Sequence, residues 1–220
     1  NEIYLDQSGG SGTFTIKQDG STNKFGAVND RAGLTGNSKT FTSITTGTGN
    51  NILIQETGNS TTTELLITGN TNEVDSNVEG DSNDTTFEIT GNTNTLLVKA
   101  DVAADVENTT NNSNIDVTIE GNTNDVTFSM VDTDAAVNLW SLIGDLNVVN
   151  SYQQGQTGGI GHAQTVELFG SSNNVDIYQI GTEAHTIDLQ VLGSDNDYTI
   201  TQTDGTTPTY TNPSAVTTQP

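Results

Sequence analysis

The chain has 220 residues, no cysteine and a formal net charge of −23 at pH 7, and only 30% of its residues are hydrophobic. The lack of cysteine excludes disulfide bonds, zinc sites built on thiolates and cysteine nucleophiles. Every basic residue lies at or before Lys99, so the sequence lacks the basic surface that binding to nucleic acid or to an anionic membrane requires.

A repeat begins in residues 1–35, where the first two units are centred on Gly9 and Gly20. The sixteen residues from Gly20 to Gly36 indicate an insertion near residues 26–35. From residue 36 to residue 98 the repeat is regular, because glycines recur every eleven residues, at positions 36, 47, 58, 69, 80 and 91. A short fixed period of this kind is typical of repeat architectures, whereas disorder, the alternative for so polar a composition, would not maintain it.

Each unit predicts one short strand and one tight turn. Apolar residues alternate with polar ones on both sides of the glycine, as in Phe87, Ile89, Leu96 and Val98, which is the pattern of a strand with one buried face. The Gly-Asn-Thr-Asn segment between them is typical of turns, since glycine tolerates positive φ and asparagine tolerates left-handed geometry. An eleven-residue period also occurs in right-handed helical coiled coils, but the abundance of Thr, Asn, Gly and Val argues against a helix.

A meander of antiparallel hairpins would also repeat strands and turns. A β-solenoid explains better why turns of one composition recur at one spacing, because equivalent residues then stack above one another. We therefore predict an all-β fold, a β-solenoid or β-helix of units of about 11 residues with about two strands per coil. Stacked asparagines are expected to form ladders. The predicted turn and ladder residues are Gly20, Asn23, Gly47, Asn50, Gly69, Asn72, Gly80, Asn83, Gly91, Asn94, Gly121, Asn124, Gly144, Asn147, Gly170, Asn173, Gly193 and Asn196.

Beyond the regular array the repeat is interrupted. It weakens over residues 99–115, returns at Gly121 and is least regular over residues 132–161, which contain the only tryptophan and a glycine-rich loop. We predict one solenoid domain over residues 1–205 and a tail over residues 206–220, whose three prolines favour an extended, non-strand conformation. No stretch has the length of a transmembrane helix or the features of a signal peptide. The sequence begins with Asn1 instead of Met, as expected if a leader or the first residues have been removed.

The segment Gln18-Asp-Gly20-Ser-Thr-Asn23 matches the Gln-x-Gly-x-x-Asn core of the curlin repeat, and most of the chain resembles that family. Partial matches precede Gly58, Gly155, Gly181 and Gly205, and the other units have an aliphatic residue in place of glutamine. The resemblance implies a β-solenoid that stacks end to end into extracellular fibres. Degenerate repeats of this kind, opening with a segment such as Asn1-Glu-Ile-Tyr-Leu-Asp-Gln7, are also similar to virion structural proteins of marine bacteriophages.

Several residues invite a chemical role, and each has a simpler structural interpretation that we favour. Trp140 is either part of a partner-facing patch or a core or end-cap residue, and the ends of solenoids commonly need caps. His162 and His185 lie near one coil apart, but two imidazoles without a carboxylate or thiolate make a poor metal site. Aspartate and asparagine in the turns are calcium ligands in other repeats, yet the calcium-binding nonapeptide is absent. The glycine-rich loop at residues 155–161 lacks the lysine and helix of a phosphate-binding loop.

We therefore expect no catalytic, cofactor-binding or metal-binding residue and no enzyme activity. Our leading hypothesis is a non-enzymatic structural protein, a fibre or decoration component on the outside of a marine phage virion. The alternatives are a secreted, curli-like filament subunit of an extracellular matrix and a β-helical enzyme that acts on polysaccharides through paired carboxylates. The expected partners are other copies, other structural proteins of the virion or fibre, or a cell-surface glycan, at the virion surface or in the extracellular space.

Overall fold

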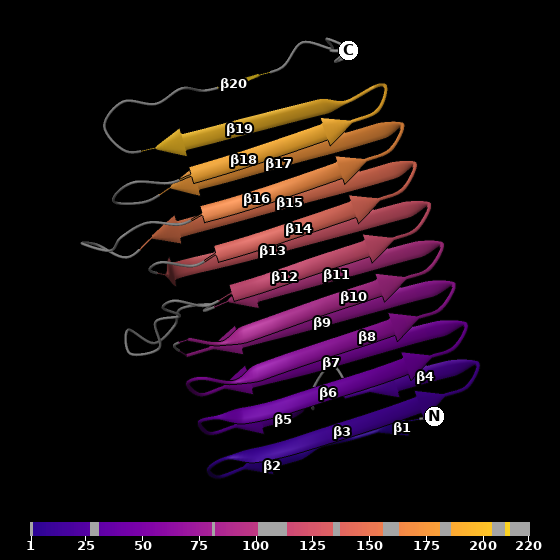
Figure 1. The fold of residues 1–220 in the computed structure, drawn as a ribbon, viewed down its shortest axis with the longest axis vertical. Coiled ribbons are helices and arrows are strands. Elements are labelled where there is room, and N and C mark those ends of the chain that lie inside the picture. The colour runs from indigo at the N-terminus through magenta and orange to yellow at the C-terminus, as the bar shows by residue number, and fades with distance from the viewer. Residues whose placement is uncertain are drawn as a thin grey trace.

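The computed structural model describes residues 2–26, 31–80, 82–100, 114–133, 137–155, 163–180, 186–203 and 210–211. These residues form strands and turns and no helix, and the strands stack along one axis into a β-solenoid (Figure 1). The predicted all-β solenoid is therefore confirmed. Every strand pairing within it is parallel except the last, between β19 and β20, which is antiparallel.

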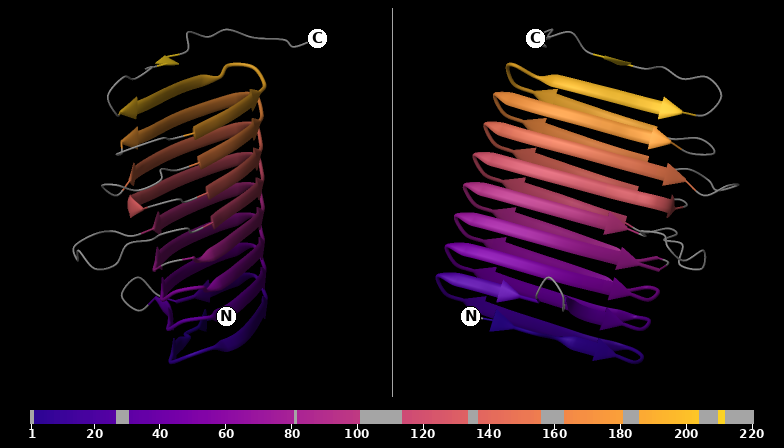
Figure 2. Two further views of the ribbon diagram at one scale, coloured as in Figure 1. Left: turned by 60° about the vertical axis from the view of Figure 1, so that its left-hand side comes forward. Right: turned by 180° about the vertical axis from the view of Figure 1, so that it is seen from behind.

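The strands belong to two sheets that face each other across a thin interior (Figure 2). The eight-strand sheet consists of β3 (Gly12–Asp19), β6 (Lys39–Thr46), β8 (Thr62–Thr68), β10 (Asp84–Thr90), β12 (Asn114–Glu120), β14 (Val137–Ile143), β16 (Ala163–Phe169) and β18 (Thr186–Leu192). The twelve-strand sheet consists of β1 (Glu2–Ile3), β2 (Asp6–Ser8), β4 (Thr22–Phe25), β5 (Ala32–Thr35), β7 (Gly49–Thr57), β9 (Thr71–Glu79), β11 (Thr93–Ala100), β13 (Thr123–Thr133), β15 (Leu146–Gly155), β17 (Ser172–Ile180), β19 (Asp197–Thr203) and β20 (Tyr210–Thr211).

Each full coil contributes one strand to each sheet, as the sequence predicts. In the regular array, residues 22 positions apart pair in register, so that Asn50 lies beside Asn72 and Asn72 beside Asn94. Equivalent side chains therefore form columns parallel to the solenoid axis. Because alternate residues of a strand point to opposite faces, each column lies wholly inside or wholly outside the solenoid.

The core is built from the inward columns of both sheets. The central column of the eight-strand sheet contains Leu65, Phe87, Val117, Trp140 and Val166, all at most 2% exposed. Facing residues of the twelve-strand sheet complete the interior, and the Phe128 ring meets the Trp140 ring edge-on at 4.9 Å between centroids. Two apolar layers are enough to fill so thin an interior, which is why a chain with 30% hydrophobic residues can fold this way.

Two regions differ from the sequence-based expectation. Residues 132–161 were expected to be irregular, but they contain β14 and β15, which pair with the strands of neighbouring coils, in register except for one shift between β13 and β15 after Met130. The alternation is preserved there, although Trp140 fills the position that smaller residues occupy in other coils. The tail was expected to be free of strands, but Tyr210–Thr211 forms β20 against Ile200 and Thr199 of β19.

The solenoid has two edges where the chain passes between the sheets. At the first, which we call the ladder edge, the chain leaves a strand of the eight-strand sheet through a glycine and reaches an inward asparagine three residues later. At the second, the opposite edge, the chain returns from the twelve-strand sheet. Insertions such as residues 101–113 and 156–162 fall in the sequence between a strand of the twelve-strand sheet and the next strand of the eight-strand sheet.

The turn glycines are needed for two different reasons. At the opposite edge Gly36, Gly58 and Gly80 adopt positive φ, which glycine does without steric cost. At the ladder edge Gly69 and Gly91 do not, so the expectation of positive φ for both is wrong. There the constraint is crowding along the axis, since a Cβ atom on Gly91 would lie 2.0 Å from the carbonyl oxygen of Gly69.

This crowding predicts the effect of a methyl group. We expect Gly91→Ala to lower the free energy of unfolding by about 1–3 kcal/mol, because the backbone of the neighbouring coil must shift. Gly49→Ala is the matched control in the same kind of turn, since a Cβ atom there meets nothing within 4 Å. Thermal unfolding monitored by circular dichroism measures both. Equal midpoints for the two variants would contradict the role assigned to Gly91.

Candidate functional site

The structure brings together eight of the nine predicted asparagines. One lies in each coil at the ladder edge, at the start of a strand of the twelve-strand sheet, and parallel register stacks them in a single inward column. The members are Asn23, Asn50, Asn72, Asn94, Asn124, Asn147, Asn173 and Asn196, and we call this column the asparagine ladder. Its glycine partners Gly20, Gly47, Gly69, Gly91, Gly121, Gly144, Gly170 and Gly193 precede them by three residues.

The ladder is continuous from Asn23 to Asn196. Each Nδ2 donates a hydrogen bond to the Oδ1 of the next asparagine along the chain, at distances of 2.7–3.2 Å. Nδ2 also donates to a backbone carbonyl at the end of a strand in the next coil, as from Asn50 to Thr68 at 3.1 Å and from Asn124 to Ile143 at 3.2 Å. Both amide protons are thus used, and the ladder asparagines up to Asn173 are at most 3% exposed.

The hydrogen bonds of the ladder hold neighbouring coils together. A side-chain amide is donor and acceptor at once, so an identical neighbour satisfies it and a column can extend without limit. The residues are neutral at every ordinary pH and carry no nucleophile. The ladder therefore fixes the register of successive coils.

Gly80 and Asn83, also predicted as ladder residues, lie at the opposite edge instead. The Oδ1 of Asn83 accepts hydrogen bonds from the backbone nitrogen of Thr61 at 3.0 Å and from its hydroxyl group at 2.8 Å. The partner in the preceding coil is thus a threonine, so no asparagine column forms there. At the opposite edge Ser38, Ser60 and Ser82, two residues after the glycine, all adopt φ of 58°. Serine at that position is not by itself a signal, because Ser172 follows the ladder-edge Gly170 in the same way.

A second buried polar column lies near the opposite edge in the C-terminal half. Nε2 of Gln179 donates to Oε1 of Gln153 at 2.8 Å, and both side chains are fully buried. Gln18, the glutamine of the curlin-like motif, is also buried, and its Nε2 donates to the carbonyl of Lys24 at 3.1 Å. Gln153 and Gln179 thus extend the principle of self-complementary amides to a second column, whereas Gln18 bonds to the backbone.

Glu56 is the one carboxyl group that lies fully buried among the described residues, and the sequence analysis did not single it out. It occupies an inward column of the twelve-strand sheet between Leu34 and Val78. The alternation Ile52, Ile54, Glu56 already places it inside, so this was the available signal. Burial away from water raises the pKa of Glu56 from 4.5 to about 7, against a smaller lowering by the Thr63 and Thr61 hydroxyl groups.

The Thr61 and Thr63 hydroxyl groups offset part of the effect of burial on Glu56, while one arrangement of the Thr61 hydrogen bonds accommodates the protonated acid. Oε2 of Glu56 lies 3.2 Å from the Thr61 hydroxyl oxygen, and that hydroxyl lies 2.8 Å from Oδ1 of Asn83. A hydroxyl group has one proton to donate. If Thr61 donates to Asn83, the protonated acid completes the chain by donating to Thr61. The buried cation nearby in the fold, Lys39, donates instead to the carbonyl of Gln7 at 2.9 Å.

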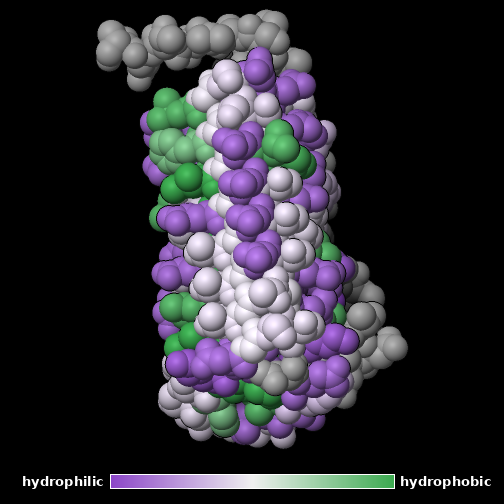
Figure 3. Space-filling model, turned by 90° about the vertical axis from the view of Figure 1, so that its right-hand side faces the viewer, coloured by the Kyte–Doolittle hydropathy of each residue, from purple (hydrophilic) through white to green (hydrophobic). Residues whose placement is uncertain are grey.

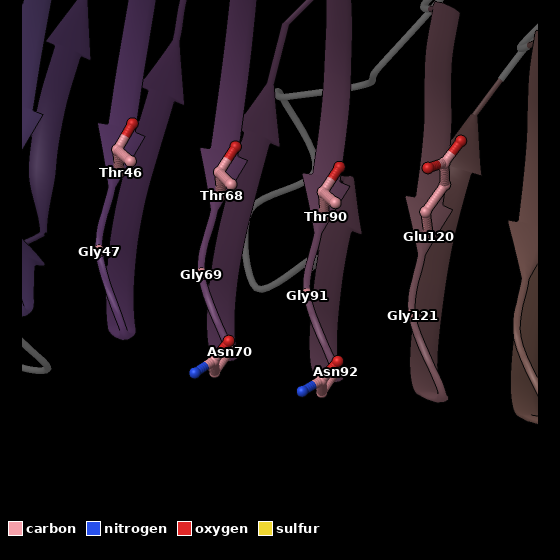
Figure 4. Close-up of a pocket in the computed structure, with 10 residues that line it drawn as sticks. All are labelled: Thr46, Gly47, Thr68, Gly69, Asn70, Thr90, Gly91, Asn92, Glu120 and Gly121. Atoms are coloured by element: carbon pink, nitrogen blue, oxygen red, sulfur yellow. The ribbon is translucent and has the colours of Figure 1, made fainter.

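The outside of the ladder edge carries a shallow groove of about 650 Å³. Its lining residues lie at strand ends and turns of four successive coils (Figure 4). They are Thr46, Gly47, Thr68, Gly69, Asn70, Thr90, Gly91, Asn92, Glu120 and Gly121. Its polar side-chain groups are three hydroxyl groups, two amides and the carboxyl group of Glu120, which is the single titratable group of this lining. Figure 3 shows the same edge in space-filling form, with hydrophilic residues in a row along the axis.

The remaining candidates divide between core residues and undescribed residues. Trp140 is fully buried, so its interpretation as a core residue is correct and a partner-facing role for it is not. His162, His185 and residues 156–161 of the glycine-rich loop lie outside the described residues. Within the described ranges, no three histidine, aspartate or glutamate side chains are grouped as metal ligands. That part of the chain also has no helix that could cross a membrane.

Comparison with protein-family models, with curated proteins and with solved structures finds no match to this chain.

The ladder predicts a large difference between two neighbouring asparagines. We expect Asn94→Ala to lower the free energy of unfolding by about 1–3 kcal/mol, because it leaves the buried amide of Asn72 without its acceptor and that of Asn124 without its donor. Asn92→Ala, at the exposed tip of the same turn (Figure 4), should change it by less than about 0.5 kcal/mol. Thermal or urea unfolding measures both, and a loss that is equal in the two variants would remove the ladder as a source of stability.

Glu56 predicts a pH dependence of stability. The folded state holds the proton to about pH 7 and the unfolded state only to about 4.5, so this contribution is complete below pH 4.5 and is lost as the pH rises through 7. At about 1.4 kcal/mol for each difference of one in pKa, the loss at pH 8 approaches about 3 kcal/mol. Glu56→Gln should therefore be more stable than the wild type at pH 8 and about equal to it at pH 4.5.

The control for Glu56→Gln is Glu88→Gln, which removes one negative charge from the exposed face of β10. Urea unfolding between pH 4 and pH 8 gives the free energies. A difference between Glu56→Gln and the wild type that does not change with pH would mean that Glu56 titrates in the folded state as it does in water.

Proposed function

We propose that this chain is a non-enzymatic structural protein, a β-solenoid rod that serves as a fibre or decoration component on the outside of a virion. The observation that carries the proposal is the asparagine ladder together with the parallel columns around it, because this continuous column of buried amides serves the stacking of one coil on the next. A rod of this kind supplies length and rigidity. Its high negative charge keeps it soluble in a salty medium that screens repulsion.

The end of the rod bears on the choice between a virion component and a self-propagating filament. Solenoid ends expose unpaired backbone groups that invite another strand. At the C-terminal end, β20 lies antiparallel along β19, where Tyr210 pairs with Ile200 and Thr211 with Thr199. This short strand covers part of the edge to which a second copy would add its own first strands, and so supports a rod that does not polymerise freely.

The runner-up is a secreted, curli-like filament subunit, and one observation favours it. β18, the last strand of the eight-strand sheet, pairs with β16 on one side and with no described strand on the other. An enzyme that acts on polysaccharides has less support, since glycoside hydrolysis uses a pair of carboxyl groups and the groove lining offers only Glu120.

The tail tests this proposal. We expect the intact chain to remain a monomer or a small closed oligomer as protein and salt concentrations rise, because β20 occupies the edge of β19. A chain that ends at Thr203 retains every strand except β20 and should form longer rods. Light scattering and negative-stain microscopy measure both. Long fibres formed spontaneously by the intact chain would overturn the virion proposal in favour of the filament.

A further inference from the structure

One outward column of the eight-strand sheet changes character along the rod. It consists of the last residue of each strand before the ladder-edge glycine. In the N-terminal half it contains Asp19, Thr46, Thr68 and Thr90, followed by Glu120. In the next three coils the same column contains Ile143, Phe169 and Leu192, in register with one another. We call these three residues the apolar row.

The apolar row lies at the surface. Ile143 is 44% and Leu192 is 45% exposed, and Phe169 between them is partly exposed. Leu139, on the same face of β14, is 48% exposed, and Leu146, just across the ladder edge, is 50% exposed. Figure 3 shows hydrophobic residues on both flanks of this edge toward the C-terminal end. Of the six large exposed hydrophobic residues in the described ranges, Leu139, Ile143 and Leu192 share the outer face of the eight-strand sheet and Leu146 lies just across the ladder edge, a grouping typical of an interaction surface.

Acidic side chains lie on the same outer face as the row and in the adjacent turn. Glu120 occupies the adjacent position of the same column, and Glu167 lies two residues before Phe169 on the same face of β16. Asp188 stands on the outer face of β18, and Asp145 is exposed in the turn after Gly144. The sequence has no lysine or arginine after Lys99 to neutralise them. The surface thus combines an apolar centre with a rim of one sign of charge.

The negative charge of the rim determines which kind of partner can bind to the apolar row. The same face of a second copy would bring acidic rim against acidic rim, which opposes association. An anionic lipid surface is repelled for the same reason. A segment with apolar side chains on one face and lysine or arginine beside them satisfies both features, because it covers the apolar centre and pairs with the rim.

We propose that the apolar row is a docking site for a cationic amphipathic segment of another protein. The apolar side chains of that segment cover Ile143, Phe169 and Leu192, and its basic groups pair with Glu120, Glu167 and Asp188. The inference rests on the proposed function, since it identifies the side of the rod that attaches to a larger assembly. It depends on a lateral surface and not on the end of the rod, so it can fail while the tail experiment succeeds.

The test uses the intact chain and a fluorescently labelled helical peptide of leucine and lysine with one apolar face. We expect saturable binding, measured by fluorescence anisotropy, which weakens as salt is added. The triple variant Ile143→Thr, Phe169→Thr and Leu192→Thr should bind at least tenfold more weakly. It should fold normally, because threonine occupies the same column at three positions of the N-terminal half. Tyr4→Thr, which removes a residue that is 58% exposed elsewhere, is the matched control and should bind as the wild type does.

The charged rim is tested separately. Glu167→Gln with Asp188→Asn should weaken binding and reduce its dependence on salt, while a leucine–glutamate peptide should not bind. Equal binding of the triple threonine variant, or equal binding of a lysine–serine peptide without an apolar face, would overturn the proposal. So would a dimer of the intact chain that the triple variant abolishes, or binding of neutral phosphatidylcholine vesicles in place of the peptide.

Discussion

The constraint on which this structure depends is that every residue of the solenoid lies beside its own counterpart in the coils before and after it, at the spacing of neighbouring strands, roughly 4.8 Å. A side chain must therefore pack against, or form hydrogen bonds with, a side chain of the same type in the neighbouring coil. Asparagine does so through its amide, glycine through the absence of a Cβ atom, and aliphatic residues through packing. An ionised carboxylate does not, and the buried Glu56 accordingly has Leu34 and Val78 as its neighbours in the column.

The same constraint explains what the sequence could predict. Columns of like residues require a fixed spacing, so the glycines at intervals of eleven and the alternation of apolar residues were sufficient for the solenoid and for two strands in each coil. They were also sufficient for eight of the nine ladder asparagines, because these share both the spacing and a position three residues after glycine. The periodicity survives even in residues 137–155, where Trp140 had obscured it.

The remaining features of the site could not be predicted from the sequence, because they depend on which of the two edges a turn occupies. Gly80 and Asn83 have the composition of a ladder turn but lie where the chain returns to the eight-strand sheet, facing Thr61. Likewise, the glycine preference at Gly91 arises from the carbonyl oxygen of Gly69 in another coil, and φ preferences within the turn cannot reveal that contact. The proximity of Glu56 to Thr61 could not be predicted either, since the hydroxyl group lies across the turn at Gly58.

The two edges also differ in how much the number of residues varies from coil to coil. From the start of β8 to Asn72, of β12 to Asn124 and of β16 to Asn173, the interval is ten residues in every case. The intervals between successive ladder asparagines nevertheless range from 22 to 30 residues. Apart from the residues between β4 and β5 in the first coil, the variation is thus confined to the stretch between a strand of the twelve-strand sheet and the next strand of the eight-strand sheet. The ladder edge therefore keeps a constant number of residues, and the opposite edge accommodates insertions. Foreign peptides inserted at the opposite edge, several to a rod, would leave the asparagine ladder in place.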